Sequence, residues 1–128
     1  MGEARDMAAE NAWTPHVLKM INEAWKLRLG MAQAAQGLAD SEMRKRADHV
    51  AARFDKQFWQ AVEGCGLAVQ SPAGQLYQEG MPVDPINLMD FEPEEQLFIE
   101  QVLRPVIKVQ DAPEVLQRAT VVLRSVKG

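Results

Sequence analysis

Few side chains in this sequence have the type and spacing that a catalytic site or a metal site requires. His16 and His49 lack Cys, His or carboxylate partners at the spacing of a metal site. Cys65 has no adjacent histidine, and Ser71 and Ser125 do not lie in a nucleophile-elbow sequence. We therefore predict no catalytic residue, no metal ligand and no bound cofactor. The protein is expected not to be an enzyme and to work by contacting another protein.

The composition is that of an ordinary folded domain. The chain has 128 residues, of which 47% are hydrophobic and 25% charged, and this is enough for one core. Its single cysteine excludes an intrachain disulfide and suits a reducing compartment. The N-terminus has acids where a secretory signal needs basic residues, and no apolar run approaches the roughly 18 residues of a membrane span. We expect a cytoplasmic protein with no membrane association.

The net charge of -4 lies in the second half of the chain. Residues 1–64 carry nine basic and nine acidic residues, whereas residues 65–128 carry five and nine. The second half is therefore a poor candidate for binding a phosphate backbone. The basic run 44–46 has acidic neighbours and no interleaved aromatic residues, so we expect no nucleic-acid partner.

Two amphipathic helices are predicted over residues 13–65, after a disordered segment at residues 1–12. Thr14 can cap the first helix, Pro15 suits its first position, and the apolar period continues to about Gly37. Asp40 then begins a second helix. The apolar stripe of that helix is Met43, Ala47, Val50, Phe54, Phe58, Ala61 and Cys65. A short turn between the two helices predicts an antiparallel hairpin.

The hairpin has two apolar edges that one internal contact does not obviously cover. Trp13 and Trp25 lie on the first helix, and Phe54 and Phe58 on the second. Because exposed apolar patches usually mark an interface, we expect these four residues to mediate self-association as a homodimer. The alternative is that both helices pack on the C-terminal half of the same chain.

From residue 66 onward the pattern becomes extended, and residues 66–128 are predicted to form a small β-domain. Residues 67–70 and 75–78 read as a hairpin around a Pro and Gly turn. Residues 80–93 read as an irregular segment with one strand, and residues 94–104 fit either a helix or a strand. Strands at 106–109, 114–116 and 119–123 would close the domain. The predicted fold class is α+β, with a helical hairpin followed by a mostly antiparallel β-domain.

Over about residues 43–125, the order of elements and short motifs resembles divergent GrpE-like nucleotide exchange factors. The residues that carry the resemblance are Gly74, Gln75, Tyr77, Gly80 and Met81, then Ile99, Glu100, Arg104 and Pro105, then Gln117, Arg118, Val121 and Val122. The chain departs from the family in its shorter first helix and in having Gln117-Arg118-Ala119 where Arg-Pro-Ala is common.

The resemblance implies binding to a DnaK-type chaperone ATPase and promotion of nucleotide release, without covalent chemistry. In that family the helices dimerise and the β-domain contacts the ATPase. By analogy, the residues expected to bind the partner are Tyr77, Met81, Asp84, Met89, Phe91 and Arg104. Residues 79–100 carry seven acids and no Lys or Arg, so their field could steer a basic partner surface.

Other interpretations of these residues stay open. Met81, Met89 and Phe91 also suit a protein core. Arg104 could simply pair with Glu100 or Glu95. The main alternative function is a structural or adaptor subunit that docks into a larger assembly through its helical hairpin.

Overall fold

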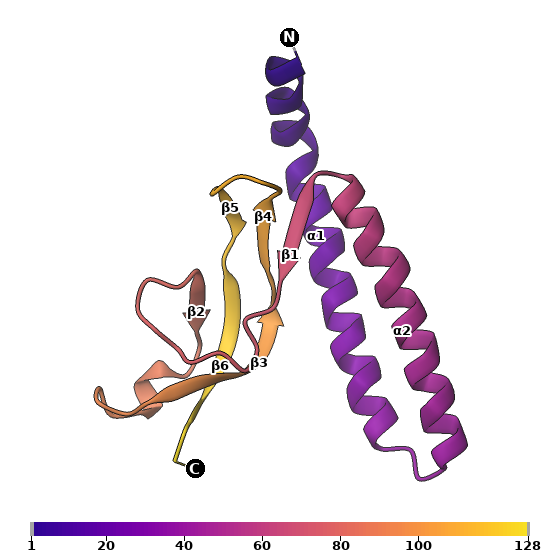
Figure 1. Cartoon of the computed structure of the whole chain (residues 1–128), viewed down its shortest axis with the longest axis vertical. Coiled ribbons are helices and arrows are strands. Elements are labelled where there is room, and N and C mark those ends of the chain that lie inside the picture. Colours follow the sequence, from indigo (N-terminus) through magenta and orange to yellow (C-terminus); the bar gives the residue numbers. More distant parts are fainter. Residues whose placement is uncertain (1, 128) are drawn as a thin grey trace.

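The structure, a computed structural model, describes the backbone of residues 2–127 and the side chains of residues 14–127. Its elements in chain order are α1 (Gly2–Gln36), α2 (Ser41–Gly64), β1 (Leu67–Gln70), β2 (Val83–Pro85), the 3₁₀ turn η1 (Leu88–Asp90), β3 (Leu97–Arg104), β4 (Val106–Val109), β5 (Val115–Gln117) and β6 (Ala119–Ser125). Two helices form a hairpin beside a small β-domain (Figure 1). The predicted α+β class is confirmed.

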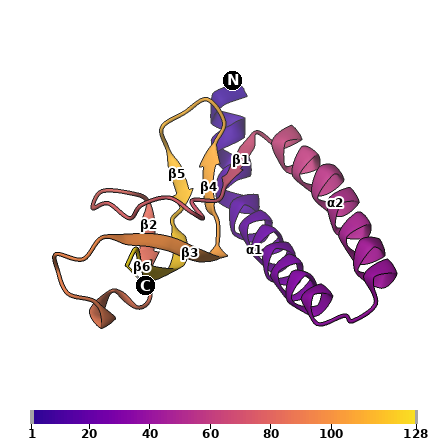
Figure 2. The same cartoon turned by 60° about the horizontal axis from the view of Figure 1, so that its bottom comes forward.

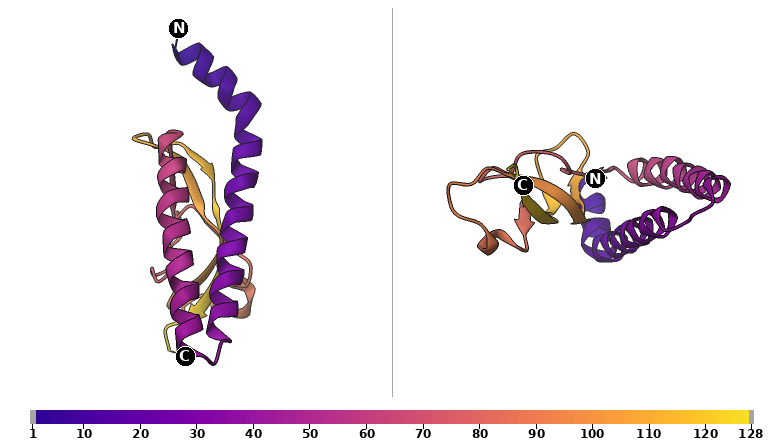
Figure 3. Two further views of the ribbon diagram at one scale, coloured as in Figure 1. Left: turned by 90° about the vertical axis from the view of Figure 1, so that its right-hand side faces the viewer. Right: turned by 90° about the horizontal axis from the view of Figure 1, so that it is seen from below.

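Helix α1 extends further toward the N-terminus than the sequence suggested. The backbone of residues 2–12 is helical, in place of the disorder that we expected. This segment is rich in alanine and glutamate, which have high helix propensity. Pro15 consequently lies inside the helix instead of at its start. Proline removes one backbone hydrogen bond and crowds the preceding turn, which accounts for the bend in the N-terminal part of α1 (Figure 3).

Helix α2 begins and ends where its capping residues predict. The Asp40 carboxylate accepts hydrogen bonds from the backbone N–H groups of Glu42 at 2.8 Å and Met43 at 3.3 Å. Gly66 follows the helix with a φ of +82°, a conformation that glycine adopts without steric cost. The chain can therefore turn directly from α2 into β1.

The β-domain consists of two three-stranded sheets with the strand orders β1-β4-β5 and β2-β6-β3. Among the strand pairs of residues 2–127, β2–β6 alone is parallel. Strands β3 and β4 are separated by Pro105 alone, and β5 and β6 by Arg118 alone, so each of these ribbons passes from one sheet into the other (Figure 2). The ambiguous segment 94–104 is thus mainly strand, from Leu97 onward.

The predicted hairpin between residues 67–70 and 75–78 is wrong. Strand β1 pairs with β4, with Leu67 opposite Val109 and Val69 opposite Ile107, while Leu76 makes an isolated bridge to Phe98. The long-range pairing places Leu67 and Val69 against the apolar cluster under the helices. A local hairpin would not bury these side chains in the same way, so burial decides the pairing.

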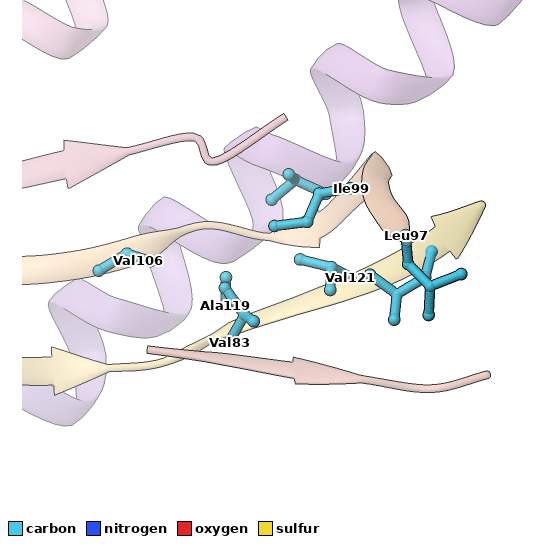
Figure 4. Packing of buried hydrophobic residues seen from close by; sticks show 8 residues of the cluster. Val83, Leu97, Ile99, Val106, Ala119 and Val121 are labelled. Atoms are coloured by element: carbon cyan, nitrogen blue, oxygen red, sulfur yellow. The ribbon is translucent and has the colours of Figure 1, made fainter. Parts of the chain in front are cut away.

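Two apolar clusters hold the molecule together. The first fills the β-domain and is shown in part in Figure 4; its buried members are Val83, Leu97, Ile99, Val102, Val106, Ala119, Val121 and Leu123. The second joins Ile21 of α1, Val62 of α2 and Ile107 of β4. This cluster fixes the middle of α1 and the last turn of α2 to the β-domain, while the turn between the two helices lies away from the strands (Figure 1).

Candidate functional site

The segment of residues 84–95, which we call the acidic loop, exposes apolar side chains to solvent. Met89 is 96% exposed, Ile86 63% and Leu88 42%. Met89 and Leu88 belong to η1, so a single short turn displays both of them. Contiguous exposed apolar side chains on a folded domain indicate an interaction surface.

The acidic loop is fixed to strand β6 by hydrogen bonds. The Asn87 side chain donates to the Leu123 carbonyl and accepts from the Leu123 N–H, both at 2.9 Å. The backbone N–H of Ile86 donates to the Val121 carbonyl at 3.0 Å, and Phe91 packs against the β-domain core. Because the loop is held at both ends of η1, little conformational entropy needs to be lost when a partner binds.

The loop carries acids around its apolar residues. They are Asp84, Asp90, Glu92, Glu94 and Glu95. Of these five acids, only Asp84 forms a salt bridge within the described part of the chain, with Arg118 at 3.0 Å. A basic partner surface that binds the acidic loop would thus contact exposed apolar side chains with acidic residues around them.

The structure divides the six residues expected to bind a partner into three groups. Asp84 and Met89 are exposed on the acidic loop. Tyr77, Met81 and Phe91 are half-buried against the β-domain core. The core interpretation is therefore met at Met81 and Phe91 but not at Met89, which is exposed. The sixth residue, Arg104, lies outside the loop at the end of β3.

Arg104 does not pair with the acids that the sequence suggested. Its guanidinium donates to the Gln117 side chain at 2.8 Å, while Glu100 pairs with Arg124 at 2.7 Å. In register, Arg104 is opposite Thr120 of β6, which is opposite Asp84 of β2. Two strand spacings, about 10 Å, therefore separate the backbones of Arg104 and Asp84.

Sequence reasoning missed Ile86 and Leu88 as exposed residues. The available signal was their position in an acidic segment between Pro85 and Pro93, which restricts regular strand pairing. The anchoring role of Asn87 had no such signal, since its partner is 36 residues away.

The aromatic residues expected to mediate self-association occupy different environments. The indole N–H of Trp25 donates to the Val102 carbonyl at 2.8 Å, and its ring contacts Trp59 with centroids 5.9 Å apart. Trp25 therefore faces the β-domain. Phe54 and Phe58 stack on each other at 5.1 Å and are half-buried, and the Trp13 side chain lies outside the described residues.

Other apolar residues cover the side of the hairpin away from the β-domain. Since a helix turns about 100° per residue, Leu27 lies roughly opposite Trp25, and Val50 roughly opposite Trp59. We call this side the outer face and define it by four residues and their exposed fractions, Met20 (65%), Leu27 (57%), Met43 (53%) and Val50 (59%).

The two helices are joined by an ion pair. Arg28 donates two hydrogen bonds to the Asp55 carboxylate, at 2.6 and 2.8 Å, and the Trp59 indole donates a third at 3.3 Å. The hydrogen bonds from Arg28 lower the pKa of Asp55, and those to Asp55 raise the pKa of Arg28. Arg28, Asp55 and Trp59 bond to one another, so we assign this ion pair a role in stabilising the helix hairpin.

Within the described part of the chain, no group of three or more His, Cys, Asp or Glu residues is placed to hold a metal ion. The helices in the same part are too polar to cross a lipid bilayer. Comparisons of the chain with protein families, curated proteins and solved structures found no match. The acidic loop is the candidate site because its apolar side chains are exposed and its backbone is fixed to β6.

Proposed function

We propose that this protein is a GrpE-like cochaperone that binds a DnaK-type chaperone ATPase through its acidic loop and promotes nucleotide release. The observation that carries the proposal is Met89, which is 96% exposed on a turn that Asn87 fixes to β6. The order of short motifs that resembles the GrpE-like family supports the same conclusion. A cytoplasmic location belongs to the proposal, because a lone cysteine suits a reducing compartment.

The mechanism needs no covalent step. A protein that binds the open form of an ATPase more tightly than the closed form shifts the population toward the open form. By linkage it weakens nucleotide binding by the same factor, and a coupling of about 1–3 kcal/mol is the usual scale. The β-domain would supply the rigid surface that discriminates between the two forms.

The test is the release rate of a fluorescent ADP from purified DnaK-type ATPases of the same cell, with and without this protein. We expect saturable acceleration by the wild-type protein and its loss in Met89→Ala. The matched control is Met20→Ala, the same substitution at an exposed methionine on α1. Both side chains are solvent-exposed, so neither variant should unfold the protein.

Two results would contradict the proposal. One is the absence of any responding ATPase. The other is an equal response from Met89→Ala and wild type, since the acidic loop would then not be the contact.

The outer face supports a second candidate function, an adaptor or structural subunit that docks through its hairpin. Its four exposed apolar residues come from both helices and form a face without a described partner. The same face is a suitable contact for a homodimer. Under this alternative, Leu27→Ala and Val50→Ala weaken binding or self-association in sedimentation experiments, while Met89→Ala has no effect.

A further inference from the structure

A groove lies between α1 and the β-domain, and none of its lining residues belongs to the acidic loop. Its volume is about 950 Å³, at the upper end of the usual range for ligand sites. One wall is α1 between Pro15 and Gln33, and the other includes Gln101, Leu103 and Thr120. That stretch of helix is about 27 Å long, which matches an extended peptide of about eight residues.

The groove is basic although the protein has a net charge of -4. Its lining contains Lys19, Lys26 and Arg104 against one acid, Glu23. Glu23 pairs with Lys26 at 2.6 Å, which leaves Lys19 and Arg104 without a salt-bridge partner among the described residues. Arg104 uses one N–H for Gln117, and its exposed guanidinium retains further donors.

A pair of amides fixes one side of the groove. The Asn22 amide donates to the Gln117 side chain at 2.7 Å, and the Gln117 amide donates back to Asn22 at 2.9 Å. Gln117 also donates to the Pro105 carbonyl at 2.9 Å. Asn22 is only 8% exposed, so this pair ties α1 to β5 and sets the position of Arg104 before any ligand arrives.

The rest of the lining suits a peptide. Leu18, Leu29 and Leu103 offer apolar surface, while Gln33 and Gln101 carry amides that can bond to a peptide backbone. The residues that line the groove include no aromatic side chain on which a nucleic-acid base could stack.

We infer that this basic groove binds an acidic peptide segment in an extended conformation, with carboxylates at Lys19 and Arg104 and an apolar side chain over the leucines. Charge complementarity favours this partner, because Lys19 and Arg104 face an open channel in an otherwise acidic protein. The inference does not depend on the proposed function, since the groove and the acidic loop have no residue in common.

The experiment is fluorescence anisotropy with the full chain and a labelled twelve-residue peptide of Asp and Glu with two Leu residues. A peptide with Asn and Gln in place of the acids is the neutral control. We expect saturable binding of the acidic peptide alone, weakened by salt. The double variant Lys19→Gln/Arg104→Gln should bind about tenfold more weakly.

A second double variant separates local from global charge. Lys45→Gln/Arg46→Gln removes the same charge from exposed positions on α2, outside the groove, and should bind like wild type. The inference is overturned if the acidic peptide does not bind, or if both double variants weaken binding equally. It is also overturned if a single-stranded oligonucleotide of equal charge binds as tightly as the peptide. Replacing Arg104 also removes its hydrogen bond to Gln117, so the single variant Lys19→Gln is measured as well. It leaves that bond intact and should still weaken peptide binding.

Discussion

The Asp55 carboxylate accepts hydrogen bonds from two side chains, one on each helix. Arg28 approaches it from α1 with two hydrogen bonds, and Trp59 approaches from one turn further along α2. Trp59 also contacts Trp25, whose indole N–H is bonded to the β-domain. A single ionised group therefore takes part in aligning the helices with each other and, through the two tryptophans, with the strands.

The pKa of Asp55 gives a prediction for stability against pH. Arg28 lowers this pKa in the folded state, so folding favours the charged carboxylate. The ionised Asp55 carboxylate contributes its full stabilisation above its pKa in the unfolded chain, about 3.9. This stabilisation is lost as the pH falls through the lower pKa of the folded protein. We expect the stability difference between wild type and Asp55→Asn to be constant near neutral pH and to shrink below about pH 3.9.

Urea unfolding at a series of pH values measures this difference. The control is Glu63→Gln, another acid of α2 that is exposed and forms no salt bridge within the described residues. A difference for Asp55→Asn that stays constant down to acid pH would show that the ion pair does not stabilise the fold.

The local elements were largely predictable from the sequence, because their signals are local. Asp40 caps α2 through residues two and three positions away, and Gly66 turns the chain directly after the helix. Strand pairing was not predictable in the same way. The pairing of Leu67 with Val109 depends on a cluster that forms only when the helices also pack there.

Side-chain roles were less predictable than elements. Trp25 lies on an apolar stripe of α1. The sequence pattern of such a stripe is the same whether it packs on the β-domain of its own chain or on a second copy of the protein. The structure shows Trp25 bonded to Val102. Met89 and Phe91 likewise have similar sequence surroundings, yet one is exposed and the other is packed against the core, because Asn87 determines how the loop turns.

The same substitution, Gly→Ala, should change the stability of the protein in opposite directions at two glycines, Gly66 and Gly30. A Cβ added at Gly66 or at Gly30 would meet no atom within 4 Å, so backbone conformation alone decides the effect. Gly66 has a φ of +82°, and Gly66→Ala should destabilise the protein by about 1–2 kcal/mol. Gly30 lies inside α1, and Gly30→Ala should stabilise it by about 0.5–1 kcal/mol.

Chemical denaturation of the two variants beside wild type tests this pair. Changes of the same sign would mean that contacts, and not the backbone conformation, determine the response at one of the two positions.

At the scale of the whole molecule, three candidate binding surfaces lie on different parts of the fold. The acidic loop is attached to β6, the basic groove lies between α1 and the strands, and the outer face is on the far side of the hairpin. In the view from below in Figure 3, the helical hairpin extends away from the strands that carry the acidic loop. A partner on the loop would thus leave the outer face accessible.

This arrangement requires the hairpin and the β-domain to fold as one unit. Ile21 is the test residue, because it is 2% exposed and packs with Val62 of α2 and Ile107 of β4. We expect Ile21→Ala to destabilise the protein by about 2–5 kcal/mol, through lost burial and a cavity. Its neighbour Met20 is 65% exposed, and Met20→Ala should change stability by less than about 0.5 kcal/mol.

The measurement compares two probes of the same unfolding reaction. Far-UV circular dichroism follows mainly the helices, while exchange of backbone amides in β3 and β6 follows the β-domain. If the second cluster couples the two parts, Ile21→Ala lowers the stability seen by both probes equally. A loss confined to the helical signal would mean that the β-domain folds without the hairpin. The acidic loop would then keep its shape without the helices, and its partner binding would survive deletion of residues 1–65.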